Sequence, residues 1–537
     1  MSPGSIRRSQ QESTGGQGCA AQYCRKKTTS MTALVTDGLA FWAGRSPDRP
    51  AIVFDGTDTL SYAALQRWSD AAGHYLMGKG LRSGDRVGII GSNSLEWVVA
   101  ALGALKVGAV VVPLNNRFCS AELRYLFEDT TPRLVLTDDA ASEVTREAVA
   151  GTRTALVGLG ELSGLRHSSP QQLLRVCDAH PDDVTQIVYT SGTTSKPKGV
   201  IFTHRTTFNL IADLSLSDSN FRSEAKILYV LSMAGAPGLL WHILHPITRG
   251  MTVYYERRFD PVVTLNRLAN EKIDIFCGVP LLFDRMAAQP EFVEADLSSL
   301  SVATIAGAPA ATSTIKVWLE KGVRLRQAYG MTELGGVSSI NPVEQALVRP
   351  HSIGRGSVYN RMRVVRPDGS DCAPGEHGEI VIAGPAITPG YWGNPQAYDE
   401  VMCDGWFHSG DVGVVDEEGW LQVVDRMKDI IITGGFNVAP SEIEAVIAEI
   451  DGVVDVCVIP AHDAKFGEAA AAIVHAAGEV TAQSVFDHCR QRLAGYKQPA
   501  HVVMEAAPLP RMISGKISRR QIRDLYPHLN SATQPIS

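Results

Sequence analysis

The sequence predicts a two-domain α/β protein: a large N-terminal domain of helix-covered sheets plus a small β-barrel-like region, followed by a hinged small α+β C-terminal domain. Three observations lead to this prediction. Residues 33–139 alternate segments of helical period with short β-branched runs, and the alternation resumes beyond residue 200. Near Ile353 the composition changes to short runs separated by turn dipeptides. The chain of 537 residues is also too long for a single hydrophobic core.

The N-terminal extension, residues 1–30, differs in composition from the rest of the chain. It is polar and glycine-rich, contains several basic residues and lacks the apolar core of a secretory signal. We expect it to be disordered, and a transit peptide is the less favoured interpretation. Met31, just before the first patterned segment, offers an alternative translation start.

Residues 31–427 are expected to form the large domain. The segment "ALQRWSDAAGHYLMGKG" is typical of an amphipathic helix, because its apolar residues recur at helical spacing. Strands of a mainly parallel sheet are predicted at "RVGII", "AVVVPL", "RLVLT", "GMTVYY", "IDIFCGVP" and "SVATIAG". Beyond Ile353, antiparallel strands are predicted at "MRVVRPDGS", "GEIVIAG" and "GWLQVV".

Residues 428–525 are expected to form the small domain, and residues 526–537 a tail. Pro440 and Ser441 predict the start of a helix with a capping box from Ser441 to Glu444. A β-branched run, "VVDVCVIP", follows it. Helix, strand and helix after the charged joint "DRMKD" indicate a small α+β domain hinged to the large one.

Charge and cysteine content narrow the classes of partner. The formal net charge of -7 argues against a protein that coats nucleic acid, since that role needs a basic face. Nine scattered cysteines without a CxxC pair indicate reduced thiols in a cytoplasmic protein. The longest apolar run, Val98 to Leu114, is interrupted by Lys106 and Gly108 and is too short for a membrane span. We therefore expect small-molecule partners, no nucleic acid and no stable membrane insertion.

The polar loop "YTSGTTSKPKGV", residues 189–200, has the chemistry of a phosphate site. It follows the apolar run "TQIVY", so it leaves the carboxyl end of a strand, where α/β proteins place ligands. Its glycines let backbone N–H groups converge on an anion, its hydroxyls donate further hydrogen bonds, and lysine supplies charge. The P-loop pattern fails, because Lys198 is followed by Gly199. Taken alone, the loop is more typical of a polar turn.

Five downstream motifs in a fixed order change that interpretation: "AYGMTE" (328–333), "WFHSGD" (406–411), "DRMKD" (425–429), "GGFN" (434–437) and "SGK" (514–516). With the loop, they resemble the adenylate-forming (ANL) superfamily of acyl-CoA synthetases, luciferases and peptide-synthetase adenylation domains. The resemblance covers nearly all of residues 33–525 and is greatest to the AMP-forming fatty-acid and aryl CoA ligases. Ser195 departs from the family, which usually has glycine there.

The resemblance implies two half-reactions. A carboxylate attacks the α-phosphorus of ATP to give acyl-AMP and pyrophosphate, and the thiol of coenzyme A then displaces AMP. ATP, Mg²⁺ and coenzyme A are the implied co-substrates and cofactor. Glu333 would ligate Mg²⁺, with Thr194 as a second metal candidate, and Lys198 would meet the departing pyrophosphate. The nucleotide candidates are Thr190, Ser191, Gly192, Thr193, Thr194, Lys198, Gly307, Ala308, Pro309, Tyr329, Gly330, Thr332, Asp411, Arg426 and Lys516.

The family pattern also implies which residues catalyse and which move. Lys516, with Thr194 and Glu333, would be catalytic: the lysine would bridge the substrate carboxylate and the α-phosphate. Lys428 would be the hinge that withdraws Lys516 after adenylation. The alternative for Lys516 is a solvated basic run. A surface salt-bridge cluster of Arg426 with Asp425 and Asp429 is also expected from the local sequence, and it is compatible with a hinge at Lys428.

Candidates for the other two substrates are less specific. The small domain would meet coenzyme A through Gly434, Gly435, Phe436 and Lys497. The segment from Val230 to Trp241 lacks the aspartate that amino-acid-activating relatives usually have. Its small residues predict a roomy apolar pocket for a medium-chain, long-chain or bulky acid, although helix packing would give the same pattern. The acyl-pocket candidates are Met233, Ala234 and Gly235.

Two other functions compete with the CoA ligase. One is an acyl-AMP ligase that transfers the acyl group to a carrier protein, and the other is a non-catalytic nucleotide-binding regulator. Lys198, Glu333 and Lys516 together argue against the regulator, because binding alone would not need all three. The sequence leaves open which acid is activated, and it leaves the oligomeric state open, a homodimer included.

Overall fold

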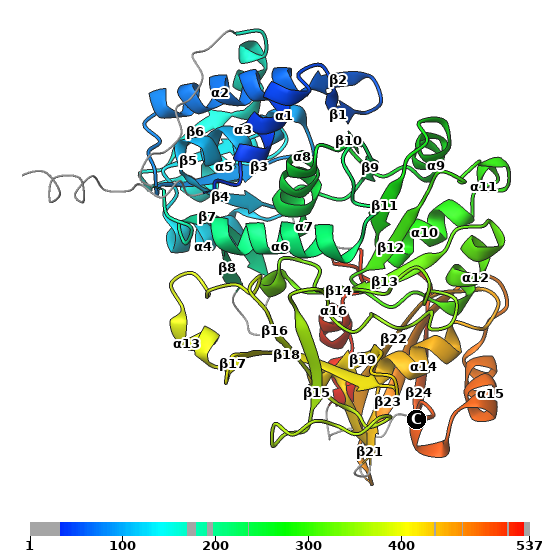
Figure 1. The fold of residues 1–537 in the computed structure, drawn as a ribbon. Helices are drawn as coiled ribbons and strands as arrows, with labels where there is room; N and C mark the ends of the chain where they lie inside the picture. The colour runs from blue at the N-terminus through cyan, green and yellow to red at the C-terminus, as the bar shows by residue number, and fades with distance from the viewer. Residues whose placement is uncertain are drawn as a thin grey trace, which may run out of the picture.

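The computed structural model describes residues 33–168, 179–190, 197–234, 236–433, 436–463, 465–512 and 515–530. Four sheets organise these residues (Figure 1). Two belong to the helix-covered part of the large domain, one to its β-rich region, and one to the small domain. The predicted fold class is confirmed.

The first sheet has six strands in the order β6-β5-β3-β4-β7-β8. It is parallel except for the antiparallel pair β7 and β8, which flanks the polar loop. The strands are β3 (Arg86–Ile90), β4 (Val110–Leu114), β5 (Leu134–Thr137), β6 (Ala155–Gly158), β7 (Val184–Thr190) and β8 (Lys198–Thr203).

The second sheet has eight strands in the order β14-β13-β12-β11-β9-β10-β1-β2. Its centre is parallel, and both edge strands run antiparallel to their neighbours. The strands are β1 (Pro50–Phe54), β2 (Asp58–Ser61), β9 (Lys226–Tyr229), β10 (Thr252–Tyr255), β11 (Ile275–Gly278), β12 (Val302–Ala306), β13 (Leu325–Tyr329) and β14 (Ser339–Ile340).

Helices cover both sheets because their apolar faces match the sheet surfaces. They are α1 (Asp37–Arg45), α2 (Tyr62–Gly78), α3 (Leu95–Val107), α4 (Ser120–Thr130), α5 (Ser142–Val149), α6 (His204–Ser217), α7 (Ala236–Leu239), the π-helix η3 (Leu240–Leu244), α8 (His245–Arg249), α9 (Pro261–Asn270), α10 (Pro280–Ala287), α11 (Glu291–Glu294) and α12 (Thr312–Glu320). Short 3₁₀-helices lie at η2 (Leu159–Leu165) and η4 (Thr332–Leu334).

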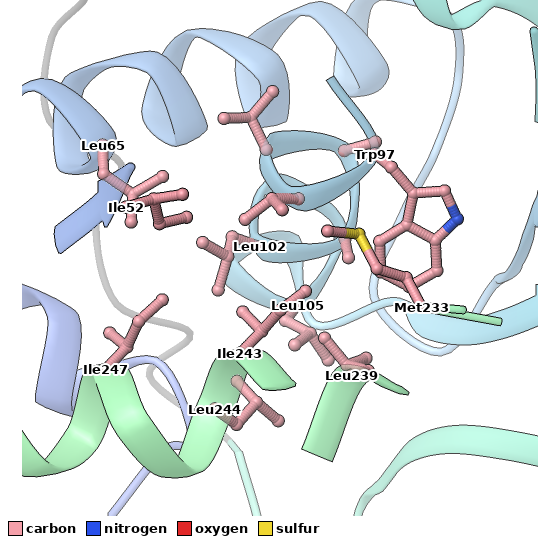
Figure 2. Close-up of a cluster of buried hydrophobic side chains, with 14 of the residues drawn as sticks. Ile52, Leu65, Trp97, Leu102, Leu105, Met233, Leu239, Ile243, Leu244 and Ile247 are labelled. Carbon is pink, nitrogen blue, oxygen red and sulfur yellow. The ribbon is translucent and has the colours of Figure 1, made fainter. Parts of the chain in front are cut away.

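The largest hydrophobic cluster lies where α2, α3, η3 and α8 meet both sheets (Figure 2). Helix α3 is almost wholly apolar, and eleven of its thirteen residues are buried, the exceptions being Glu96 and Lys106. Gly103 lets α2 approach closely, since a Cβ there would lie 2.8 Å from the backbone nitrogen of Gly73. The predicted succession of helix, turn and buried strand over Val98–Leu114 is confirmed as α3, a left-handed Gly108 and β4.

The β-rich region is an antiparallel five-stranded sheet, β15-β16-β18-β17 with β19 paired to β18. Its strands are β15 (Arg361–Val365), β16 (Gly378–Ala383), β17 (Met402–Cys403), β18 (Trp406–Val415) and β19 (Leu421–Arg426), and the short helix α13 (Pro395–Asp399) precedes β17. A 3₁₀-turn, η5 (Met427–Asp429), leads to the small domain.

The small domain has its own mixed sheet, β21-β20-β23-β22, with β24 parallel to β23. One face packs against α14 and α15, and the other packs against α16 and η7. The elements are β20 (Ile431–Thr433), β21 (Phe436–Val438), α14 (Pro440–Ile447), β22 (Val453–Asp463), β23 (Gly467–Ala476), α15 (Ala482–Arg492), η6 (Gly495–Lys497), β24 (His501–Glu505), α16 (Arg519–Leu525) and η7 (Pro527–Asn530).

The predicted capping box of α14 is wrong, although the helix begins at Pro440 as expected. Ala439 occupies the N-cap position, so Ser441 lies inside the first turn. Its Oγ donates to the carbonyl oxygen of Val424 over 2.6 Å, and its N–H donates to Asp425 over 2.9 Å. Contacts between the domains have therefore replaced the local cap.

In the described part of the chain, no helix combines the length and apolarity that crossing a bilayer requires.

Candidate nucleotide and catalytic site

A cavity of about 420 Å³ lies between the two domains, at the carboxyl ends of β12 and β13. The ends of β12 and β13 form one wall of the cavity, strands β18 and β19 form a second, and the small domain forms a third. Several residues predicted for the nucleotide line it together: Gly307, Ala308, Pro309, Tyr329, Gly330, Asp411, Arg426 and Lys516. They come from five separate segments of the sequence, which the fold gathers at one place.

Asp411 is the centre of a polar triad at this cavity. Tyr329, the last residue of β13, donates its hydroxyl to Asp411 Oδ2 over 2.7 Å. Arg426 Nε lies 2.6 Å from Asp411 Oδ1, because β18 and β19 pair these two residues directly. Burial raises the pKa of Asp411, and Arg426 opposes that shift. Each carboxylate oxygen has a second lone pair, so Asp411 can accept a further hydroxyl.

Lys516 enters the same cavity from the small domain. Met512 N–H donates to the Lys516 carbonyl over 2.7 Å, and Gly515, the residue before Lys516, has a left-handed φ of +83°. A Cβ on Gly307 would lie 3.4 Å from Lys516 Cε, so the lysine stem passes directly over this glycine. Burial lowers the pKa of Lys516, Arg426 lowers it further, and Asp411 opposes both.

Glu333 and Lys198, the residues predicted to meet Mg²⁺ and pyrophosphate, are not among the residues that line this cavity. Glu333, in η4, is 8% exposed, and its Oε1 accepts a hydrogen bond from Tyr391 over 2.9 Å. Lys198 Nζ lies 4.9 Å from the centroid of the same tyrosine ring. Thr332 begins η4, and Thr190 pairs with Lys198 across β7 and β8.

Glu333 fits the role of a magnesium ligand. Mg²⁺ prefers carboxylate and phosphate oxygens and is usually held by one or two carboxylates plus substrate phosphates. The residues that the structure describes contain no group of three or more side chains able to hold a metal by themselves. A cation here would therefore depend on the oxygens of a bound nucleotide as well as on Glu333.

Several predicted residues lie outside the described residues. These are Ser191, Gly192, Thr193, Thr194 and Ser195 of the polar loop, Gly235 of the acyl segment, and Gly434 and Gly435 of the small domain. Their assignments stay predictions.

The described coenzyme A candidates lie together on the small domain. Phe436 stacks on Tyr496 with ring centroids 4.6 Å apart, and both rings are exposed. Lys497 pairs with Glu442 over 2.6 Å. Phe436 and Lys497 come from different motifs, so the fold creates one apolar and basic face from them.

The two acyl-pocket candidates that the structure describes are buried. Met233 is buried in the core beside Trp97 (Figure 2), and its N–H donates to Asn93 over 2.9 Å. Ala234 is also buried. Neither residue lines the cavity between the domains, so their part in an acyl pocket stays a prediction.

Lys428, the predicted hinge, is exposed in η5. The expected salt-bridge cluster around Arg426 is wrong in its pairing, because Arg426 turns to Asp411. Asp425 and Asp429 instead meet Arg519 of α16, at 3.7 Å and 3.3 Å. The charged joint therefore connects the two domains rather than forming a local surface cluster.

Sequence reasoning missed Tyr391 and the contact of Ser441 with β19. Tyr391 lies in the stretch "GYWGNP", whose Gly-Tyr and Pro indicate a turn and nothing about a partner. Glu333 is 58 residues away in the chain. No local pattern predicts a hydrogen bond over that separation.

The chain is similar to known proteins both in sequence and in fold. The family model described as AMP-binding enzyme matches residues 39–392, and the one described as AMP-binding enzyme C-terminal domain matches residues 442–516. The chain is 36% identical over 494 residues to a feruloyl-CoA synthase from Amycolatopsis sp, covering 90% of this chain and 98% of the relative. It is 34% identical over 498 residues to long-chain-fatty-acid–CoA ligase FadD13 from Mycobacterium tuberculosis, covering 91% and 97%. The solved structure of ATP-bound MatB from Rhodopseudomonas palustris matches with a TM-score of 0.81 at 28% identity, covering 91% of this chain and 99% of that chain.

Proposed function

Because the chain belongs to the AMP-binding enzyme family, we propose that it is an ATP-dependent carboxylic acid:CoA ligase that works through acyl-AMP. The products are acyl-CoA, AMP and pyrophosphate. The position of Lys516 carries the proposal: a cation of the small domain lies in the same cavity as Tyr329 and Asp411 of the large domain. A site that only bound a nucleotide would not need a second domain to supply that lysine.

In the first step, an oxygen of the substrate carboxylate bonds to the α-phosphorus of ATP, and the bond to the pyrophosphate oxygen breaks. Negative charge builds on the α-phosphate and on the leaving group. Lys516 neutralises the charge on the α-phosphate, and Lys198 neutralises the charge on the leaving pyrophosphate. Cations that are already fixed in a desolvated site need no reorganisation during the reaction. Asp411 and Arg426 orient the ribose, and Tyr329 lies against the adenine.

Glu333 is the residue that would hold Mg²⁺ together with the phosphate oxygens, with Thr194 as the second metal-side candidate. When bound, the cation supplies positive charge to the phosphates. Thr332 and the loop from Thr190 to Lys198 hold the remaining phosphate oxygens.

In the second step, the thiol of coenzyme A bonds to the acyl carbon, and AMP leaves. We call the present placement of Lys516 in the cavity the adenylating arrangement. A rotation at Lys428 would withdraw Lys516 and turn the face of Phe436 and Lys497 toward the acyl-AMP. Exposure of Phe436 and Tyr496 in the adenylating arrangement supports this assignment, since that face is available for a later contact.

The substrate is a medium-chain, long-chain or bulky apolar acid. The names of the two relatives, a feruloyl-CoA synthase and a long-chain-fatty-acid–CoA ligase, support this class. We also propose a cytoplasmic enzyme that takes no nucleic acid, on the basis of the net charge of -7 and the scattered cysteines. Light scattering would distinguish a monomer from a homodimer.

Two measurements test the function. Acid-dependent exchange of labelled pyrophosphate into ATP detects adenylation, and no exchange over a broad panel of acids would favour a non-catalytic regulator. AMP release that requires free coenzyme A supports the ligase, whereas release that requires an acyl-carrier protein would favour the carrier-protein ligase. A competition panel of carboxylic acids, with thioesters identified by mass, would name the substrate.

A further inference from the structure

Tyr391 lies between the carboxylate of Glu333 and the ammonium group of Lys198. It is 5% exposed and precedes α13. Its hydroxyl donates to Glu333 Oε1 over 2.9 Å, and its ring centroid is 4.9 Å from Lys198 Nζ. A single side chain therefore contacts both the carboxylate on the metal side and the lysine assigned to pyrophosphate.

The backbone around Tyr391 is fixed to the strand that carries Lys198. Tyr391 forms an antiparallel bridge with Val200 of β8, and Trp392 N–H donates to the Gly199 carbonyl over 2.7 Å. Gly199 permits this approach, since a Cβ there would lie 3.2 Å from Trp392 Cβ. The tyrosine and the lysine are thus held in one fixed register.

The same segment is also fixed to the backbone of Glu333. Thr388 N–H donates to the Glu333 carbonyl over 2.7 Å, and Thr388 Oγ1 donates to the Ile201 carbonyl of β8 over 2.7 Å. Residues 388–392 therefore connect η4 to β8. Tyr391 extends this backbone connection to the two side chains themselves.

We propose that Tyr391 is a positioning residue for adenylation: its hydroxyl fixes the Glu333 carboxylate, and its ring fixes Lys198. This rests on the function proposed above. A carboxylate held through one oxygen keeps a single orientation, so the group meets a cation without first losing side-chain freedom. A lysine over an aromatic face keeps its full charge and its remaining donors for a phosphate.

The variant Tyr391→Phe removes the hydroxyl and keeps the ring. The Mg²⁺ concentration for half-maximal pyrophosphate exchange is expected to rise by about 10- to 100-fold, the usual range for the loss of a group that orients a metal ligand. Calorimetry of ATP binding without acid should show that Mg²⁺ enhances binding less than in the wild type. Conversion of synthetic acyl-AMP and coenzyme A to thioester should not change, because that step uses neither Glu333 nor Lys198.

Tyr398→Phe is the matched control. Tyr398 packs edge-on against Tyr391 with centroids 6.2 Å apart, but its hydroxyl donates to the Thr388 carbonyl over 2.8 Å and does not meet Glu333. It should behave as the wild type in Mg²⁺ response. A third variant, Tyr391→Leu, also removes the ring and should additionally raise the KM for pyrophosphate in the exchange reaction.

Three outcomes would overturn the proposal. They are an unchanged Mg²⁺ response in Tyr391→Phe, an equal shift in Tyr398→Phe, and an equal loss of both half-reactions in Tyr391→Phe. Absence of acid-dependent exchange in the wild type would instead contradict the proposed function, so the two failures are distinguishable.

Discussion

Among the described residues, backbone hydrogen bonds place Lys516, and no carboxylate forms an ion pair with its ammonium group. Met512 N–H donates to the carbonyl oxygen of Lys516 itself, and Arg511 donates to the carbonyl of Gly515 over 2.7 Å. The ammonium group is therefore available for a substrate. Burial lowers its pKa, so an incoming anion gains a cation that few water molecules screen.

The variant Lys516→Ala should lose adenylation by about 100- to 1000-fold, the range found when one preorganised stabilising group is removed. Thioester formation from synthetic acyl-AMP and coenzyme A should be retained, since the lysine has left the site by then. Pyrophosphate exchange and thioester formation are to be measured on the same preparation. Equal loss of both steps would contradict the proposed rotation at Lys428.

At the residue scale, motif residues were predictable and their partners were not. Tyr329, Asp411, Arg426 and Lys516 carry recognisable spacing, and the fold brings all four to one cavity. Tyr391 was missed because its interaction is with side chains from two distant segments. Met233 shows that residue type alone does not distinguish a pocket from the core. A methionine suits either place, and Met233 lies in the core beside Trp97.

The first turn of α14 docks on the end of β19. Ser441 Oγ donates to the Val424 carbonyl, and its N–H donates to Asp425. Val424 and Asp425 precede the predicted hinge, whereas Ser441 follows it. The proposed rotation at Lys428 would therefore break both hydrogen bonds, and we expect them to stabilise only the adenylating arrangement.

Ser441→Ala should lower pyrophosphate exchange by about 2- to 10-fold, which corresponds to one hydrogen bond. The rate of thioester formation from synthetic acyl-AMP should stay the same or rise, because the competing arrangement is weakened. Ser484→Ala is the control: its Oγ donates within the first turn of α15, to the Thr481 carbonyl. An equal effect of both variants would show that only helix stability had changed.

Helices α2 and α3 contain a buried ion pair between Asp70 and Lys106, at 2.7 Å and with side chains only 5% and 7% exposed. Removing one partner leaves the other charge buried and unpaired. Lys106→Met should therefore destabilise the large domain by about 3 to 5 kcal/mol. Urea unfolding followed by tryptophan fluorescence measures this loss of stability. The control is Lys79→Met, which removes an exposed ion pair with Glu161 at the C-terminus of α2 and should leave the unfolding midpoint unchanged.

At the element scale, local patterns predicted helices and strands well, because hydrophobic period and burial agree. The run "RVGII" coincides with β3, and "VVDVCVIP" lies within β22. The capping box at Ser441 failed, because a hydrogen bond to another domain replaced the local one. Tertiary contacts of this kind leave no local signal in the sequence.

At the scale of the whole molecule, the two domains have separate hydrophobic cores. Among the described residues, no cluster of buried hydrophobic side chains contains members from both sides of Lys428. Hydrogen bonds and ion pairs cross the joint instead, as in the contacts of Ser441 and Arg519 with Asp425. Domains joined in this way can change their relative placement without unpacking either core.

We therefore propose Lys428 as the domain boundary and predict the behaviour of two fragments. Residues 428–530 should fold alone and unfold cooperatively, as circular dichroism would show. Residues 33–427 should bind ATP yet adenylate no faster than Lys516→Ala, because they lack that lysine. An unfolded small fragment, or exchange by the large fragment at the rate of the full chain, would contradict the boundary or the role of Lys516.

The nucleotide cavity has walls from both domains, and this has a consequence for inhibition. A compound that fills the cavity binds only one arrangement of the chain, so its measured affinity includes the cost of populating that arrangement. Such a compound would compete with ATP for the cavity. Coenzyme A would not compete with it directly, because coenzyme A is proposed to meet the face of Phe436 and Lys497 instead. Selectivity among related ligases could then come from residues at the joint, such as Ser441, as well as from those that contact the compound.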